Sequence, residues 1–167
     1  YQASVGGVDV NVGYGSVTNG GNNQITIDGS TIETFGSTNS DTDDLSVYAI
    51  NSVDVENIVR GFDVSAAGID TIISKAIDTS IAKINIGQTA GNTFVGNEIC
   101  IEAYNAPHMK AVINNIGGGG LAIRNNIATA KASGKTTLNV DAKNNFDADE
   151  VTLVAISGED KDDGTNQ

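Results

Sequence analysis

The sequence predicts an all-β fold, a β-solenoid in which similar short strands stack in parallel. The main observation is a seven-residue phrase, apolar at alternate positions and ending in Asn, which occurs at 45–51 (LSVYAIN), 99–105 (ICIEAYN) and 138–144 (LNVDAKN). A weaker copy occupies 151–157. A period of two residues is typical of a strand with one buried face. Its repetition favours many strands on a shared thin core, and a β-sandwich is the alternative.

A second recurring element divides the chain into larger repeats. A small-residue pair precedes an apolar alternation at 6–10, 67–70 and 119–123. If Val8, Ile69 and Leu121 are equivalent, they are separated by 61 and 52 residues. Long internal periods are a sign of solenoids. We therefore predict one solenoid segment over residues 1–167 with three large repeats, about 1–60, 61–115 and 116–167, each holding more than one coil.

Shorter elements follow from local chemistry. Residues 24–35 (QITIDGSTIETF) predict two short strands around an Asp28-Gly29 turn, because Gly and Asp tolerate left-handed backbone angles. Residues 71–83 (TIISKAIDTSIAK) have apolar positions at helical spacing, but their β-branched residues favour a strand. The polar stretches at 19–23, 36–44 and 159–166 are typical of corners and loops.

Composition and charge narrow the class of protein. The 167 residues include 20 Gly but one Pro, no Trp, four Tyr and four Phe, so few bulky aromatic residues are available for a core. Disorder is the rival interpretation, and the alternating Ile, Val and Leu residues argue against it. The net charge is −12, and no Lys or Arg precedes Arg60. This charge disfavours nucleic acid and an anionic membrane surface as partners, and no apolar run is long enough to span a bilayer.

The Asn that ends the repeated phrase suggests a structural role. Equivalent side chains in successive coils of a parallel stack lie about 4.8 Å apart. An inward Asn at a corner can bond to the Asn residues above and below it and to the turning backbone. Asn51, Asn105 and Asn144 are the candidates for such a ladder. The alternative is that each Asn caps its own turn.

No residue pattern points to catalysis. The single His108 follows a strand and the single Pro, so we expect it in a turn, and Cys100 is expected to be an inert lone thiol. The Gly run at 117–120 lacks the Lys-Ser/Thr of a phosphate loop and is expected to allow a bend or a close backbone approach. We therefore predict no enzymatic activity and no cofactor.

Calcium is the one ligand that the sequence could hold, because calcium favours carboxylate and carbonyl oxygens on flexible loops. The weak candidates form two acidic clusters, Asp41, Asp43 and Asp44 and then Asp160, Asp162 and Asp163. A solvated acidic loop is the simpler interpretation of each cluster, since neither keeps the spacing of a helix-loop-helix calcium site.

The combination of repeats resembles the large filamentous adhesins of the leukotoxin-like and filamentous-haemagglutinin-like group. The resembling segments are 6–12 (GGVDVNV), 102–107 (EAYNAP) and 138–144 (LNVDAKN). The resemblance implies a right-handed parallel β-helix, export across the outer membrane by a partner transporter, and a role at the cell surface. It implies no catalytic residues.

These expectations combine into a structural segment of an extracellular bacterial fibre or adhesin. Tyr1 opens into strand-like sequence without a cap, so we expect the chain to continue or assemble head to tail with other copies of itself. Surface receptors on host or neighbouring cells are further possible partners, and membrane insertion is not expected. The alternatives are a pilin-like subunit that polymerises by strand donation and a carbohydrate-active β-helix enzyme.

Overall fold

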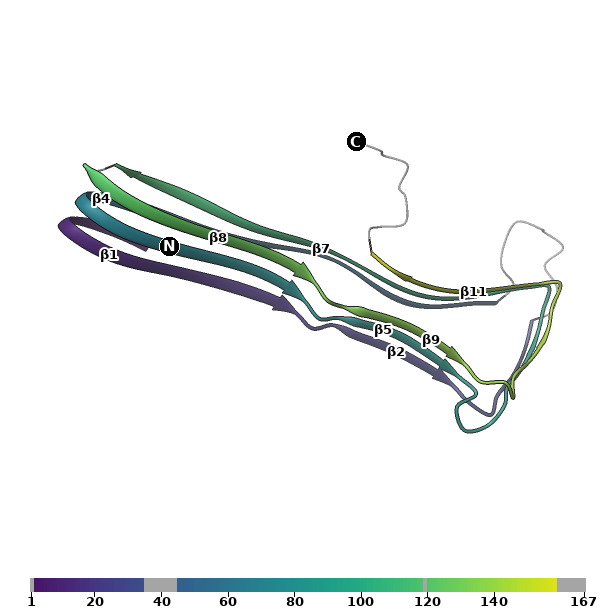
Figure 1. The fold of residues 1–167 in the computed structure, drawn as a ribbon. Helices are drawn as coiled ribbons and strands as arrows, with labels where there is room; N and C mark the ends of the chain where they lie inside the picture. The colour runs from purple at the N-terminus through teal and green to yellow at the C-terminus, as the bar shows by residue number, and fades with distance from the viewer. Residues whose placement is uncertain (1, 35–44, 119, 159–167) are drawn as a thin grey trace. The chain divides into compact units, whose positions relative to one another are not determined.

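The computed structural model describes residues 2–34, 45–118 and 120–158, and these form strands joined by short corners without a helix (Figure 1). The long strands are β1, β4, β7 and β8, which span Gln2–Asn19, Leu45–Asp78, Glu98–Gly118 and Leu121–Ala132. The shorter strands are β2 (Asn22–Ile27), β3 (Thr31–Glu33), β5 (Ile81–Ile86), β6 (Thr93–Val95), β9 (Lys135–Val140), β10 (Asn145–Asp147) and β11 (Glu150–Ser157).

The strands form three sheets. One has the order β1-β4-β7-β11, with β8 also paired to β4, and the other two have the orders β2-β5-β9 and β10-β6-β3. The described pairings are parallel and join segments that are far apart in the chain. The prediction of an all-β parallel solenoid is confirmed. The sandwich alternative is wrong, because its antiparallel strands do not occur among these pairings.

Corresponding strands recur in three passages, which we call rungs 1, 2 and 3 (residues 8–33, 67–95 and 121–147). Rung 2 follows rung 1 by 59 residues in the Asn11–Asp70 pair, and rung 3 follows rung 2 by 54 in the Asn85–Asn139 pair. Each interval holds one coil, so the expectation of several coils per repeat is wrong. Val10, Ile69 and Ile123 are paired in register. The assumed equivalence of Val8 with Ile69 is therefore wrong by two residues, because Val8 pairs with Ala67.

The chain divides into two compact units, each of which takes segments from all three rungs. Unit 1 comprises Tyr1–Asn19, Val53–Thr79 and His108–Ser133, and unit 2 comprises Gly20–Ser52, Ser80–Pro107 and Gly134–Gln167. Strands β4 and β7 contribute residues to both units.

Unit 2 has an apolar core. Side chains from all three sheets meet in it, among them Ile101, Ile84 and Phe94, which are fully buried. Phe94 stacks on Phe146 of the next rung with ring centroids 4.9 Å apart. Although the chain has only four Phe residues, two of them therefore fill one side of this core.

Unit 1 has the reverse pattern. Its returning strands β1, β4 and β8 run alongside the outgoing parts of β4 and β7 (Figure 1). The buried residues are mainly polar or small, including Asp63, Asp70, Ser74 and Asp78, whereas Val8 is 85% exposed. The alternation at 8–12 therefore places its apolar residues outside, opposite to the buried face that the period suggests.

Close approach of the two layers explains this inversion. A Cβ added at Gly15 would lie 2.5 Å from Val59 Cγ2, and one at Gly68 would lie 2.6 Å from Ser65 Oγ. Real side chains do not approach so closely, so small residues and short polar ones fill most of the interior. Among the described residues of unit 1, the large aliphatic Val59 and Ile72 are also buried, and they fit because each lies against a glycine, Gly15 or Gly61. Other large aliphatic residues lie on the outer faces.

Several local predictions can now be compared with the structure. The turn at Gly29 (φ +62°) separates β2 from β3, and residues 71–83 form strand apart from a two-residue corner, so both predictions are confirmed. The predicted close approach is confirmed at Gly117, where a Cβ would lie 2.6 Å from the Asp63 carbonyl oxygen. The turn expected at His108 is wrong, because the residue lies inside β7.

Replacement of Phe94 by Ala tests the apolar core. We expect Phe94→Ala to lower the free energy of unfolding by about 3–5 kcal/mol, because it leaves a cavity beside Phe146. The matched control is Phe62→Ala, since Phe62 is 45% exposed and its loss should cost much less. Urea unfolding followed by circular dichroism measures both variants. Equal losses would show that unit 2 lacks the described core.

Candidate functional site

The two ends of the rung stack are the main candidate site, because each end strand has one neighbour within its sheet. In the sheet β2-β5-β9, the amides of Ile81 and Gly87 donate to the carbonyls of Gly21 and Ile27. Backbone groups alternate in direction along a strand, so those of residues 22, 24 and 26 face away from β5. At the other end, Lys135 and Asp141 donate to rung 2, and residues 136, 138 and 140 face away from it.

The two ends carry opposite charge. Rung 1 contains the acids Asp9, Asp28 and Glu33 and no Lys or Arg. Rung 3 contains four basic residues against two acids, and the basic residues are Arg124, Lys131, Lys135 and Lys143. Since opposite charges attract across an interface and like charges repel, rung 3 of one molecule is electrically complementary to rung 1 of another.

Asn51 and Asn105 lie inside β4 and β7, neighbouring strands of one sheet, and their side chains bond to the backbone where β5 begins. Asn105 is fully buried, donates to the Ser80 carbonyl over 3.1 Å, and accepts from the Ser80 hydroxyl over 3.0 Å. Asn51 donates to the Ile81 carbonyl over 2.7 Å and accepts from the Asn23 amide over 2.9 Å. Both side chains therefore tie down the turning backbone.

Asn144 is not part of this group, so the predicted ladder of Asn51, Asn105 and Asn144 is wrong in its membership. The phrase at 138–144 falls in β9 and the corner after it, a different sheet from the other copies. Asn144 instead accepts from the Asn92 side chain over 2.8 Å and donates to the Ile86 and Asp141 carbonyls.

Asn92 is the functional residue of this corner that sequence reasoning missed. It is 2% exposed, and its amide also donates to the Ile27 carbonyl while its oxygen accepts from the Ser30 backbone N–H. It therefore links all three rungs. One sequence signal could have indicated Asn92: it lies 52 residues before Asn144 and follows a short polar stretch. It was missed because Asn92 is not part of the repeated seven-residue phrase.

Asp28 joins rung 1 to rung 2 at the corner after β2. Its carboxylate accepts from the backbone N–H of Ala90 over 2.8 Å and from that of Thr89 over 3.1 Å. Hydrogen bonds from the Thr89 side chain and then from the Ala90 backbone lower the pKa of Asp28 below its ordinary value of 3.8. The ionised form of Asp28 is thus the one that holds the corner.

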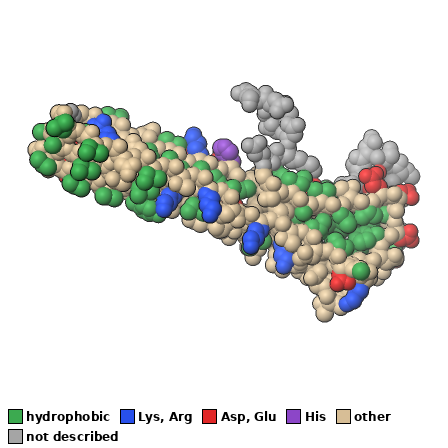
Figure 2. All heavy atoms as spheres, viewed as in Figure 1, with side chains coloured by type: hydrophobic (Ala, Val, Ile, Leu, Met, Phe, Trp, Pro, Cys, Tyr) green, Lys and Arg blue, Asp and Glu red, His purple; other side chains and the backbone are tan. Residues whose placement is uncertain are grey.

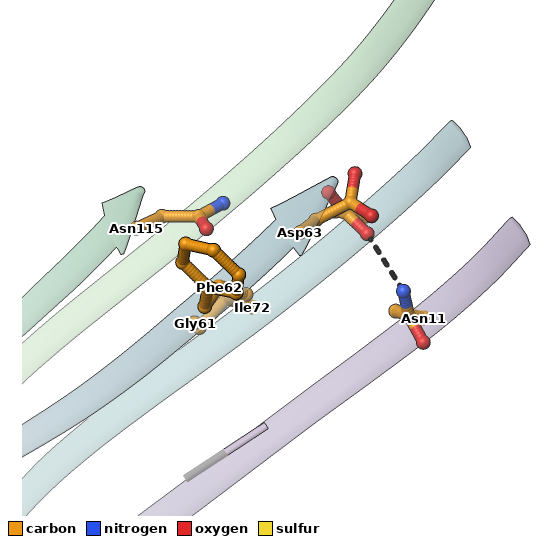
Figure 3. A pocket seen from close by; sticks show the side chains of 7 residues that line it. Asn11, Gly61, Phe62, Asp63, Ile72 and Asn115 are labelled. Carbon is orange, nitrogen blue, oxygen red and sulfur yellow. Dashed lines mark hydrogen bonds between the residues drawn. The ribbon is translucent and has the colours of Figure 1, made fainter. Parts of the chain in front are cut away.

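A small cavity lies inside unit 1 and is lined by Asn11, Asp63, Asp70 and Asn115 together with Gly61, Phe62 and Ile72 (Figure 3). Its volume of about 10 Å³ is on the scale of one water molecule. Asn11 donates to Asp70 over 3.3 Å, and Arg124 Nε lies 3.9 Å from the other Asp70 oxygen. One oxygen of Asp63 and the Asn115 amide nitrogen are buried without a hydrogen-bond partner, which suits a bridging water.

The described residues offer little for catalysis or metal binding. Nowhere among them do three His, Cys, Asp or Glu side chains form a ligand group. His108 is exposed and lies 3.0 Å from Asp54, and Cys100 is buried. The calcium candidates Asp41, Asp43, Asp44, Asp160, Asp162 and Asp163 all fall outside the described residues.

A larger hollow of about 700 Å³ lies over β4 and β7 of unit 1. Arg60 is the ionisable residue in its lining, and the rest is Gly61, Phe62 and residues 113–116. A pair of carboxylates that could cleave a glycosidic bond is therefore not present in this hollow.

Comparisons with known proteins were made at three levels, and no protein-family model, curated protein or solved structure matches the chain. Across the residues that the structure describes, no helix is long and apolar enough to cross a membrane.

Replacement of Asn92 tests the corner stack. Asn92→Ala removes side-chain bonds to rungs 1 and 3 and leaves the Ser30 N–H without its acceptor, so we expect a loss of about 3 kcal/mol in unfolding free energy. Asn145→Ala, at the exposed neighbouring position, is the control and should cost under about 0.5 kcal/mol. An Asn92→Ala variant as stable as the control would contradict the stack.

The pH dependence of Asp28 provides a second test. Its pKa is lowered on folding, so its contribution to stability is present above the unfolded pKa of about 3.9 and is lost as the pH falls through the lower folded pKa. NMR titration of the Asp28 carboxyl should give a pKa below 3.8. In Asp28→Asn this part of the acid dependence should disappear. A titration at or above the ordinary value would show that the carboxylate does not accept these bonds.

Proposed function

We propose that the chain is a structural, non-enzymatic segment of an extracellular bacterial fibre or adhesin, and that its rungs continue or assemble head to tail. The observation that carries the proposal is that, among the residues that the structure describes, the end strands β2 and β9 of one stack of parallel rungs each pair with β5 alone. In repeat proteins of this kind each repeat contacts only its neighbours, so an end without a cap can pair with a further repeat.

Charge supports one orientation for this assembly. Rung 3 of one molecule, with its excess of basic residues, would face the acidic rung 1 of the next. Inside the stack Asn11, Asp70 and Arg124 are in register in rungs 1, 2 and 3. The next copy would place its own Asn11 and nearby Asp9 above Arg124, which repeats the polar contacts already made between rungs.

The two alternative functions have weaker support. Strand donation between pilin-like subunits completes an antiparallel sandwich, whereas the described pairings here are parallel. A carbohydrate-active enzyme needs acidic side chains that converge on a groove, and the hollow over β4 and β7 has Arg60 instead. A stack of rungs suits presentation at the cell surface. Its corner loops can vary in sequence without disturbing the backbone ladder, so they could contact receptors there.

An edge variant tests the assembly. Gln24 lies in β2 with its backbone N–H directed away from β5, so Gln24→Pro removes a donor from the free edge and spares the ladder within the molecule. We expect the wild-type chain to form longer species as concentration rises, and Gln24→Pro to reduce this association at least tenfold. Sedimentation velocity measures both.

Gln24→Ala is the matched control and should assemble like the wild type, because it keeps the backbone donor. Circular dichroism should show the same strand content in all three proteins. A wild-type chain that stays monomeric at every concentration, or a Gln24→Pro variant that assembles normally, would overturn the head-to-tail proposal.

A further inference from the structure

The outer side of the returning strands in unit 1 forms a largely apolar surface, which we call the return face. It consists of the outward residues of three paired strands, at alternate positions over 8–18 in β1, 67–77 in β4 and 121–131 in β8. In β1 this places Val8, Val10, Val12 and Tyr14 in solvent, with Val8 the most exposed at 85%. The neighbouring strands add Ile69, Leu121 and Ile123, and Leu121 is 78% exposed.

Such a surface needs an occupant. Scattered exposed aliphatic residues are ordinary on proteins, but a contiguous apolar patch across three strands marks a site of interaction. The cause lies in the fold, because the closely spaced layers of unit 1 leave room inside for large side chains only where a glycine faces them, as at Val59 and Ile72. The return face is therefore a permanent feature of the folded chain.

The charges on the return face are basic. Its charged residues are Lys75 and Lys131, and the described part of this face carries no Asp or Glu. Figure 2 shows hydrophobic side chains along unit 1 with basic and without acidic side chains among them. Lys75 Nζ lies 5.7 Å from the centroid of the Tyr14 ring.

The acids of unit 1 lie elsewhere. Asp9 is half-buried and alternates with the exposed Val8 and Val10, so it belongs to the other side of β1. Asp63, Asp70 and Asp78 are buried between the layers. Asp54 and Glu56 project from the outgoing strand β4, where they pair with His108 and Lys110. The net charge of −12 thus describes the whole chain but not this face.

We propose that the return face docks on the surface of an anionic lipid bilayer. Apolar side chains flanked by Tyr and Lys are suited to the boundary between acyl chains and headgroups, where aromatic rings and lysine stems remain partly apolar while their polar ends stay hydrated. Anionic headgroups attract the two lysines. The edges of β1 and β8 carry unpaired backbone groups, which cannot enter hydrocarbon, so the face lies on the bilayer and does not cross it.

A second copy of the chain fits this face less well. Two return faces packed against each other would bring Lys75 and Lys131 either together or onto the apolar residues of the partner. Both arrangements desolvate a charge without an acid to pair with it. Lipid headgroups supply the missing anions.

Vesicle co-flotation tests the docking. The full chain should float with phosphatidylcholine vesicles that contain phosphatidylglycerol and much less with phosphatidylcholine alone. Lys75→Gln and Lys131→Gln should each weaken binding to the anionic vesicles about fivefold. Lys110→Gln, which removes the same charge from the outgoing strands, is the matched control and should bind like the wild type.

The apolar contribution is tested by the triple variant Val8→Thr, Val10→Thr and Val12→Thr, which keeps side-chain shape and strand propensity. We expect binding to fall on the order of tenfold or more. Gln24→Pro should retain vesicle binding whether or not it assembles. The test of membrane docking is therefore independent of the test of fibre assembly. No wild-type flotation, or binding that the lysine and valine variants leave unchanged, would overturn the docking. Self-association lost in the valine variant without vesicle binding would assign the face to a second copy and also overturn it.

Discussion

The parallel backbone ladder between rungs is the constraint on which the rest of the structure depends. It joins residues 59 or 62 positions apart between the first two rungs and 54 or 52 positions apart between the next two. Each rung gains partners for its backbone groups only from the rungs beside it, so every rung needs a neighbour. The side chains at the corners then have one main task, which is to keep successive turns of the chain aligned. Asn92, Asn105 and Asp28 perform it with hydrogen bonds to backbone groups of another segment.

The same ladder accommodates two different interiors. In unit 2 the three sheets leave room for Ile84, Ile101 and the stacked pair Phe94 and Phe146, and burial of these residues stabilises the unit. In unit 1 the layers are closer, so the buried Ile72 lies against Gly61, and Asp63, Asp70 and Asn11 place polar groups in the interior. One backbone arrangement therefore produces an apolar core in one unit and an apolar exterior in the other.

The sequence predicted the strands better than the direction in which their side chains point. Alternation at 45–51 and 99–105 correctly indicates strands of one sheet, because there the apolar residues also face the core. Alternation at 8–12 is equally regular, but a period of two does not say which set of residues is inside. That depends on the spacing of the layers, which Gly15, Gly61 and Gly68 set from three places in the chain. The corner residues were partly predictable, since Asn51 and Asn105 end the repeated phrase. Asn92 was not predictable in this way, because only the alignment of rung 2 with rung 3 brings it next to Asn144.

The register between rungs is the central claim, and distances between spin labels test it most directly. Gln24 and Lys83 are paired positions on neighbouring strands, and Thr137 pairs with Lys83 one rung further on. In a Cys100→Ser background, labels at 24 and 83 should show strong dipolar broadening, because paired positions lie about 4.8 Å apart. Labels at 24 and 137, two rungs apart, should show clearly weaker broadening. Equal broadening in the two pairs, or none at 24 and 83, would contradict the rung stack and everything inferred from it.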